Sequence, residues 1–188
     1  MTAFDRQDLM ILTGPEIARQ HAAGRIRIDP FDERQLNPNS YNFRLGPLLK
    51  TYTGDVLDVA RPNEVEESVL PEEGLVLEPD RIYLGHTVET MGSEHFVPII
   101  RARSSVARLG LFVHVTADLI DIGSVNQWTL QLHAVQPVRV YPGLLIGQVT
   151  FWETSGEIAL YEGKYQGSRG PAESQIHRDF PLPAQVPA

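Results

Sequence analysis

Apolar residues recur along this chain in short runs with turn residues between them. Alternation is clearest at residues 127–133, where Trp128, Leu130 and Leu132 share one face and Gln127, Thr129, Gln131 and His133 share the other. Further short runs occupy residues 41–46, 75–77, 82–84, 97–100, 113–120, 138–141 and 144–151. Many short strands with frequent turns favour a barrel or sandwich over alternating strand–helix units. We therefore predict a mainly β protein.

One short helix is predicted near the start of the chain. Thr13 and Glu16 form a capping-box pair, Pro15 lies just inside, and Gly24 provides a stop signal. Because Ile17 is its one strongly apolar residue, we expect this helix to lie on the outside of the domain.

A second short helix is predicted from Ser104 to Leu111, capped by Ser104 or Ser105 and ended by a glycine at position 110. The free N–H groups at a helix start favour an anion. Arg103 and Arg108 flank this start, and guanidinium pairs bidentately with phosphate. The pattern is typical of a phosphate site, although structural ion pairs on a surface helix would give the same spacing.

Composition narrows the class of protein. The 188 residues, 42% of them apolar, fit one domain, predicted over residues 1–180 with a proline-rich disordered tail at 181–188. The absence of cysteine excludes disulfides, thiolate nucleophiles and Cys-containing zinc sites, and the six histidines have no metal-site spacing. The sequence has no P-loop or GxGxxG motif, no apolar run long enough for a membrane helix, and no signal-peptide pattern at Met1–Asp5. We expect a cytoplasmic protein that does not bind membranes.

The net charge of −8 argues against a partner made of duplex nucleic acid. Residues 55–94 contain eleven acidic side chains against Arg61 and Arg81, and the rest of the chain holds 14 basic and 13 acidic residues. We interpret the acidic block as solvated surface. The balanced remainder can still contain an anion site.

Two loops contain further candidate residues. Asp121 lies between apolar residues, where an acid is usually a turn residue but can also bind a sugar hydroxyl or activate water. Residues 161–171 mix aromatic residues, cations and glycines, as do loops that close over anionic ligands, although most such loops are simply exposed.

Taken together, these segments resemble the dCTP deaminase branch of the trimeric dUTPase-like superfamily, from about Leu12 to Phe180. Residues 103–111, RSSVARLGL, are similar to the family's RSSLARLGL, and residues 38–46, PNSYNFRLG, are similar to its PxSxDLRLG. The segments HVTA at 114–117, ID at 120–121, PG at 142–143, IGQ at 146–148, KYQG at 164–167 and GP at 170–171 follow in the family's order.

The resemblance implies a distorted β-barrel of the dUTPase-like, jelly-roll type. It also implies a homotrimer with nucleotide sites at subunit boundaries, Mg²⁺ carried by the triphosphate, and no zinc. The site residues that it implies fall into three groups: Arg103, Ser104, Ser105 and Arg108 for the triphosphate; Asp121, Thr129 and Gln131 for the deoxyribose and base; and Gln148, Tyr161 and Lys164 to complete the site.

One departure from the family pattern affects the chemistry directly. Gln131 stands where the family's deaminases have a glutamate that shuttles protons, and an amide cannot accept and release a proton. Further departures are Ile122, Ser124, Asn126, Ser168 and Asn42.

Three hypotheses therefore stay open. The first is a zinc-independent hydrolytic deaminase that converts dCTP to dUTP, with Ser104, Arg108 and Gln131 in the catalytic centre. The second is a dUTPase-type pyrophosphatase that uses Asp121 and Mg²⁺. The third is a regulator that binds dCTP or dUTP without turnover.

Overall fold

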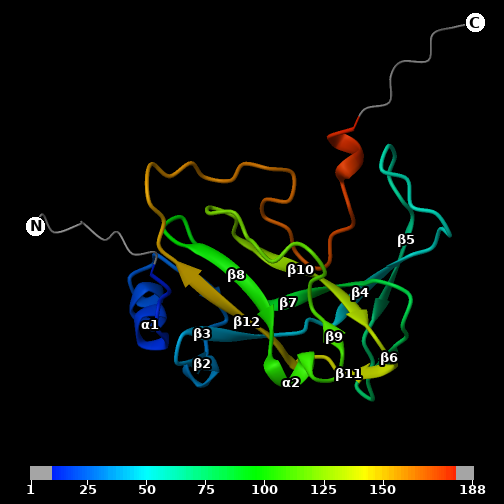
Figure 1. Ribbon diagram of the computed structural model, residues 1–188, viewed down its shortest axis with the longest axis horizontal. Coiled ribbons are helices and arrows are strands. Elements are labelled where there is room, and N and C mark those ends of the chain that lie inside the picture. Colours follow the sequence, from blue (N-terminus) through cyan, green and yellow to red (C-terminus); the bar gives the residue numbers. More distant parts are fainter. Residues whose placement is uncertain (1–9, 181–188) are drawn as a thin grey trace, which may run out of the picture.

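The computed structural model describes residues 10–180, which form a mainly β chain with short helices (Figure 1). The helices are α1 (Gly14–Ala22) and α2 (Ser104–Ala107), with 3₁₀ turns η1 (Glu33–Gln35) and η2 (Ile176–Arg178). The strands are β1 (Arg27–Asp29), β2 (Leu36–Asn37), β3 (Ser40–Arg44), β4 (Leu48–Tyr52), β5 (Val65–Val69), β6 (Leu75–Leu77), β7 (Tyr83–Gly92), β8 (Val97–Ala102), β9 (Leu111–Phe112), β10 (Asn126–Ala134), β11 (Val138–Val140) and β12 (Leu145–Trp152). The start of the chain and the predicted tail at 181–188 lie outside the described residues.

The strands form three antiparallel sheets. The largest has the order β5-β4-β7-β10-β9, with β1 paired to the end of β7. The second has the order β2-β3-β12-β8, and β11 pairs with β6 in the third. The mainly β prediction is confirmed, with the described strands arranged in separate sheets rather than in one closed ring. No helix among the described residues is long and apolar enough to cross a membrane.

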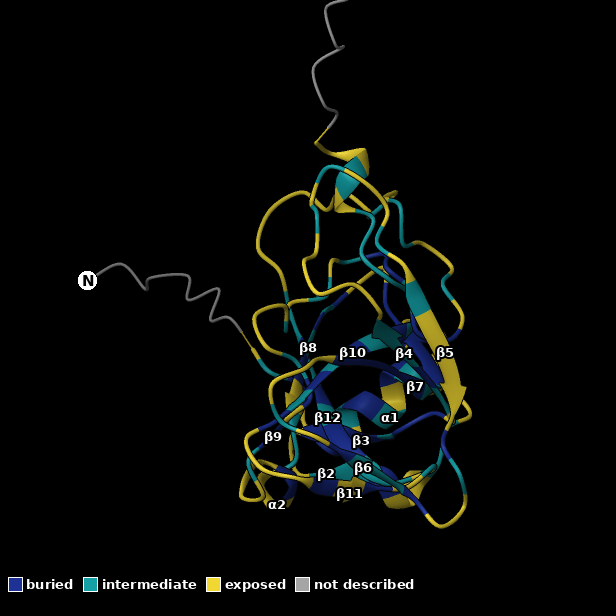
Figure 2. Cartoon of the chain, turned by 90° about the vertical axis from the view of Figure 1, so that its right-hand side faces the viewer, coloured by how far each residue is buried: buried dark blue, intermediate teal, exposed yellow. Residues whose placement is uncertain are grey.

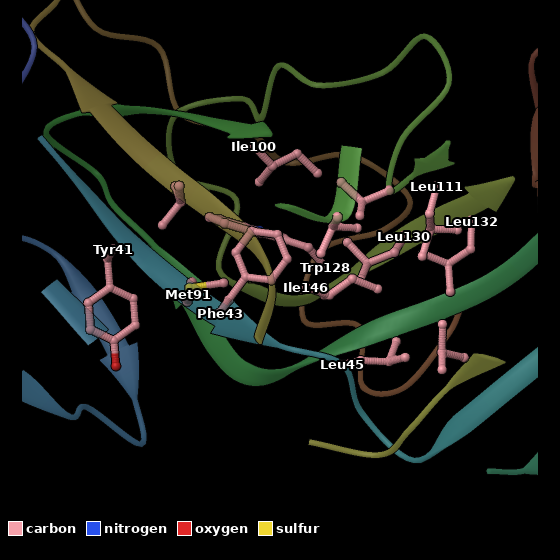
Figure 3. Close-up of a cluster of buried hydrophobic side chains, with 14 of the residues drawn as sticks. Tyr41, Phe43, Leu45, Met91, Ile100, Leu111, Trp128, Leu130, Leu132 and Ile146 are labelled. Carbon is pink, nitrogen blue, oxygen red and sulfur yellow. The ribbon is translucent and has the colours of Figure 1, made fainter. Parts of the chain in front are cut away.

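The core lies between the inner faces of the two larger sheets, where side chains from β3, β7, β10 and β12 meet (Figure 3). Trp128, Leu130 and Leu132 are buried, while the intervening residues of β10 are half-buried, as the alternation predicts. Close approach of β3 and β12 requires a glycine at position 147, because a Cβ there would meet the Phe43 ring at 2.0 Å. Figure 2 shows the buried central strands against the exposed loops and β5.

The N-terminal helix is confirmed at the edge of the domain, with Ile17 buried beneath it. Thr13 occupies the N-cap position but makes no side-chain capping bond, so the predicted capping box is wrong in this respect. The Glu16 carboxylate instead accepts hydrogen bonds from Arg19 and Gln20 one turn further along.

The second helix is shorter than predicted, because α2 ends at Ala107. The next two backbone bonds run from Leu109 N to Val106 O and from Gly110 N to Ala107 O, which tightens the last turn. Gly110 then adopts a φ of +75°, and Leu111 begins β9. The predicted serine cap is also wrong, since Arg103 is the N-cap residue and no side chain caps the helix.

The strand predicted at 113–120 is wrong, because this segment is mostly a loop that touches β8 through one isolated bridge, Ile99 to Leu119. Apolar side chains alone do not make a strand, and Val115 and Leu119 are exposed here. The predicted strands at 41–46, 75–77, 82–84, 97–100, 127–133, 138–141 and 144–151 correspond to β3, β6, β7, β8, β10, β11 and β12.

The acidic block at 55–94 is mainly solvated, with nine of its eleven acidic residues exposed. Of the other two, Asp58 is half-buried, and the Glu89 side chain is fully buried on β7. It accepts hydrogen bonds from Arg44 Nε at 2.7 Å, from Arg44 N at 2.9 Å and from Gln35 Nε2 at 3.1 Å. This carboxylate therefore joins β3 to β7 inside the protein.

We expect Glu89→Ala to lower the free energy of unfolding by about 3 kcal/mol, because it leaves Arg44 and Gln35 without their buried acceptor. Urea titration would measure the change. Glu66→Ala on the exposed strand β5 is the matched control, with an expected change below about 0.5 kcal/mol. Equal losses in the two variants would contradict this role of Glu89.

His86 is a buried neutral imidazole in β7. Its Nε2 accepts from Leu48 N at 3.3 Å, and its Nδ1 lies 2.9 Å from the Thr87 carbonyl oxygen, which places the proton on Nδ1. Burial lowers the pKa of His86 below its ordinary value, against opposing contributions from the Thr87 carbonyl and Glu67. The ring also packs against Gly46, where a Cβ would meet it at 2.1 Å.

The lowered pKa of His86 predicts a loss of stability in acid. The unfolded chain takes up a proton at this histidine below about pH 6.5, while the folded chain resists protonation, so the free energy of unfolding should fall as the pH falls through this range. Burial also lowers the pKa of His114, which adds to the same trend. Urea titrations at pH 7.5 and 5.5 should show a smaller pH dependence for His86→Asn than for the wild type, and equal dependence would refute the assignment.

Candidate active site

A cavity of about 460 Å³ lies between β10 and the C-terminal residues 160–175, which we call the cover segment. It is lined from several elements, by residues that include Tyr52, Leu84, Asp121, Ser124, Asn126, Gln127, Thr129, Gln131, Tyr161, Tyr165, Ser168 and Glu173. Four of the residues predicted for the nucleotide site meet here: Asp121, Thr129, Gln131 and Tyr161.

The alternation of β10 places Gln127, Thr129 and Gln131 along one wall of this cavity. His133 shares their face but does not line the cavity; its Nδ1 lies 3.3 Å from the Arg81 carbonyl oxygen, and its ring centroid lies 6.1 Å from that of Phe112.

Gln131 has an unused acceptor inside the site. Its Nε2 donates to the Thr129 carbonyl oxygen at 3.3 Å, while its Oε1 is buried without a hydrogen-bond partner. A buried orphan acceptor is costly, and a ligand N–H would satisfy it. The amide can thus recognise a hydrogen-bonding ligand, but it cannot take up a proton from water at neutral pH.

Thr129 and Asp121 add a hydroxyl and a carboxylate to the same cavity. Thr129 Oγ1 accepts from Ala172 N at 3.0 Å, which leaves its own proton free to donate. Asp121 is exposed in the loop before β10, and its carbonyl oxygen accepts from Ser124 N at 3.1 Å. The cavity therefore combines a charged acceptor with neutral polar groups.

The cover segment is fixed to the cavity rim by hydrogen bonds from both of its halves. Tyr161 N donates to the Ile122 carbonyl oxygen at 2.8 Å, and Gly170 N donates to Gln127 Oε1 at 2.8 Å. Near its end, Glu173 forms an ion pair with Lys50 at 2.7 Å, and the adjacent ammonium lowers the pKa of Glu173. The prediction that residues 161–171 form a loop over the site is consistent with this arrangement.

The predicted triphosphate residues lie elsewhere in the chain. Ser104 and Ser105 are in α2, Arg103 and Arg108 flank it, and none of the four lines the cavity. In Figures 1 and 2, α2 lies at the lower end of the molecule, and in Figure 1 the cover segment, drawn in orange, runs along the upper part. One chain therefore does not bring these arginines and serines to Asp121 and Gln131.

Gln148 and Lys164 also lie outside the cavity wall. Gln148 is on β12, where its Oε1 accepts from Ser40 Oγ at 3.1 Å. Lys164 is paired with Asp179 and lines a neighbouring cavity of about 370 Å³ with Tyr161 and Arg178. Tyr161 thus borders both cavities.

Residues 10–180 contain no cluster of three or more His, Asp or Glu side chains that could hold a metal ion. Magnesium commonly binds through one or two carboxylates together with substrate phosphates, and Asp121 could provide such a carboxylate. The residues present thus fit Mg²⁺ carried by a triphosphate, which stays a prediction, as does the expectation that zinc is not used.

Sequence reasoning missed several lining residues. Tyr52 belongs to β4, a strand that the pattern did not predict, and its hydroxyl accepts from Ser174 N at 3.0 Å. Glu173 and Tyr165 come from an irregular segment, where no periodicity indicates which side chains face inward. Ser124 and Asn126 were noticed only as departures from a family pattern. In the structure Ser124 lies in the loop before β10, Asn126 is the first residue of β10, and both line the cavity.

The amino-acid sequence of the chain matches those of known proteins. The family profile described as "dCTP deaminase-like" matches residues 11–154. The chain is 47% identical over 172 residues to a "dCTP deaminase, dUMP-forming" of Clostridium botulinum, a match that covers 91% of this chain and 99% of the relative. It is 45% identical over 172 residues to the protein of the same name from Leptospira biflexa, covering 91% of this chain and 98% of that relative.

The fold is also found in a solved structure. The crystal structure of 2'-deoxycytidine 5'-triphosphate deaminase from Agrobacterium tumefaciens matches with a TM-score of 0.62 and 21% identity. The match covers 78% of this chain and 49% of that one, about half its length. Together with the profile match and the close relatives, this confirms the resemblance seen in the motifs: the chain belongs to the dCTP deaminase-like family.

Proposed function

We propose that this protein is a hydrolase that converts dCTP to dUMP. The observation that carries the proposal is the covered cavity, in which Asp121, Thr129 and the unpartnered Gln131 Oε1 meet. Relatives at 45–47% identity are named dCTP deaminase, dUMP-forming. We therefore revise the product from the dUTP expected from the motifs to dUMP.

The proposed reaction consists of two hydrolytic steps. Water replaces the amino group of cytosine and releases ammonia, and a second water cleaves the phosphoanhydride and releases pyrophosphate. Thr129 and Gln131 would contact the base, with Gln131 Oε1 accepting from its exocyclic amino group. Asp121 would orient the water for the phosphoanhydride step and contact the deoxyribose or the Mg²⁺ of the triphosphate.

We propose that the complete site forms between copies of the chain in a homotrimer. In the single chain α2 lies away from the cavity, so a neighbouring copy would have to supply Arg103, Ser104, Ser105 and Arg108 for the triphosphate. Apolar side chains near α2 are exposed, with Leu109 at 53%, Phe112 at 50% and Val135 at 65%, as expected of a surface that another copy covers. Gln148 and Lys164 would join the triphosphate site from outside the cavity wall. A cytoplasmic location stays a prediction.

A second candidate function is a dUTPase-type pyrophosphatase that forms dUMP from dUTP. Gln131 favours it specifically, because cleavage of the phosphoanhydride needs no proton shuttle at the base, whereas deamination does. In both candidates Asp121 serves the phosphoanhydride step.

The two candidates are separated by incubating the protein with dCTP or dUTP and Mg²⁺, followed by anion-exchange separation of nucleotides and an ammonia assay. Formation of dUMP, pyrophosphate and ammonia from dCTP would support the first. Formation of dUMP from dUTP, with no product from dCTP, would support the second. Binding of both nucleotides without any product would contradict both and favour a regulator.

A further inference from the structure

We propose that Asn126 is a positioning residue that holds two segments together around the cavity. One is the cover segment, and the other is the loop at residues 120–125, which we call the Asp121 loop. Asn126 is the first residue of β10 and is only 5% exposed. Its amide has two ends, and each end is bonded to a different part of the candidate site. The structural part of this inference stands without the proposed function, and only its kinetic consequence depends on it.

The donor end of the amide reaches the Asp121 loop. Asn126 Nδ2 donates to Ser124 Oγ at 2.8 Å, and both side chains are buried. Ser124 N in turn donates to the Asp121 carbonyl oxygen at 3.1 Å. Through Ser124, Asn126 thus fixes the backbone that presents the Asp121 carboxylate.

The acceptor end of the amide reaches the cover segment. Asn126 Oδ1 accepts from Ser168 N at 3.1 Å, and Ser168 Oγ donates to the Tyr165 carbonyl oxygen at 2.6 Å. Tyr165 N then donates to the Tyr161 hydroxyl at 3.2 Å. This chain of bonds leads from Asn126 to Tyr161 and Tyr165, the two cavity-lining tyrosines of the cover segment.

The Asn126 amide can donate to Ser124 and accept from Ser168 at the same time without burying a charge. A carboxylate has acceptors alone, and alanine or glycine has neither group. Two departures from the family pattern, Ser124 and Asn126, contact each other through their side chains, and Ser168 joins them through its backbone N–H. Gln166 forms a second link at the exposed rim, from its Nε2 to the Gly123 carbonyl oxygen at 2.8 Å. Loss of Asn126 should therefore loosen the cover segment without detaching it.

The consequence is a site whose walls are fixed before a nucleotide binds. Fixed walls strengthen binding of the ground state and the transition state alike, which affects KM more than kcat. Asn126 acts through Ser124 and Ser168, and we assign it no contact with the reacting atoms.

The test is Asn126→Ala, with Asn42→Ala as the matched control. Asn42 is also 5% exposed and hydrogen-bonded, but it lies on β3 away from the cavity. Hydrogen exchange of residues 161–170 in the nucleotide-free protein should accelerate about tenfold in Asn126→Ala and stay within about twofold of wild type in Asn42→Ala. The KM for dCTP with Mg²⁺ should rise about tenfold in Asn126→Ala, with kcat within about threefold of wild type.

Unchanged exchange of residues 161–170 in Asn126→Ala would overturn the proposal, whatever the activity. Equal acceleration in both variants would also overturn it, because the effect would then be a general loss of stability. If wild type does not turn over dCTP, the proposed function fails, while the exchange result still decides the role of Asn126.

Discussion

Replacing Gln131 with glutamate is expected to raise the rate of ammonia release from dCTP by about 10²–10⁴-fold. Gln131 is on the cavity wall, and its buried Oε1 has no partner in the protein. A glutamate has nearly the same shape and would place a carboxylate oxygen at this position. It could take a proton from the attacking water and deliver it to the leaving ammonia, which the amide cannot do.

The comparison that isolates this effect uses a second glutamine of the same strand face. Gln127→Glu adds a carboxylate to the same wall, but Gln127 is bonded to the Val88 carbonyl oxygen and to Gly170 N, and it should give no increase. Formation of dUMP from dUTP should be nearly unchanged in Gln131→Glu, because that reaction needs no proton transfer at the base. An ammonia rate that does not rise would show that Gln131 is not at the position of the proton shuttle.

Replacing both Arg103 and Arg108 with alanine is expected to weaken triphosphate binding by about 10²–10⁴-fold, since each charge-assisted hydrogen bond contributes about 1.5–3 kcal/mol. The measurement is calorimetric titration with the α,β-imido analogue of dUTP, which resists cleavage, in the presence of Mg²⁺. Arg139→Ala, on β11, removes one cation that is hydrogen-bonded to the Glu73 and Gly74 carbonyl oxygens, and it is the control for net charge. Undiminished affinity in the double variant would refute the phosphate assignment.

The same variant also tests whether the site forms between chains. A protein carrying Arg103→Ala and Arg108→Ala should be inactive, and so should one carrying Asp121→Ala. Co-refolding equal amounts would pair an intact α2 from one chain with an intact cavity from the other, and should restore up to about a quarter of the wild-type activity. No recovery would place both groups in the same chain and contradict the proposed assembly.

The local pattern was sufficient for the strands that have one buried and one polar face. The alternation in β10 predicted its bounds to within one residue at each end, and it predicted the face that carries Gln127, Thr129 and Gln131, because the period of a strand is two residues wherever the strand lies. It failed at residues 113–120, which form a loop with Val115 and Leu119 exposed, and at α2, which stops after four residues. In both places the outcome depends on packing against other segments, and a local pattern contains no information about that packing.

The residue types of the candidate site were evident before the fold, and their grouping was not. The motifs indicated a phosphate site around Arg103 and a base site around Gln131 as parts of one centre. The structure separates them within a chain, and this separation supports the proposal of a site between copies, which the family resemblance also implies. Glu89 lies in an acidic block that the sequence predicts to be solvated, but its side chain is buried. Arg44 and Gln35, from a different part of the chain, donate hydrogen bonds to it there.

The sequence by itself determined the family, the mainly β class and the polar face of β10, because each depends on residues that are close together in the chain. Only the tertiary structure decided that Asn126 joins the Asp121 loop to the cover segment, that Gln131 has an orphan acceptor, and that α2 lies away from the cavity. These features depend on contacts between segments that lie far apart in the chain. Asn126 and Ser168, for example, are 42 residues apart. Such contacts are set by the packing of the whole core, and no period or short motif encodes them.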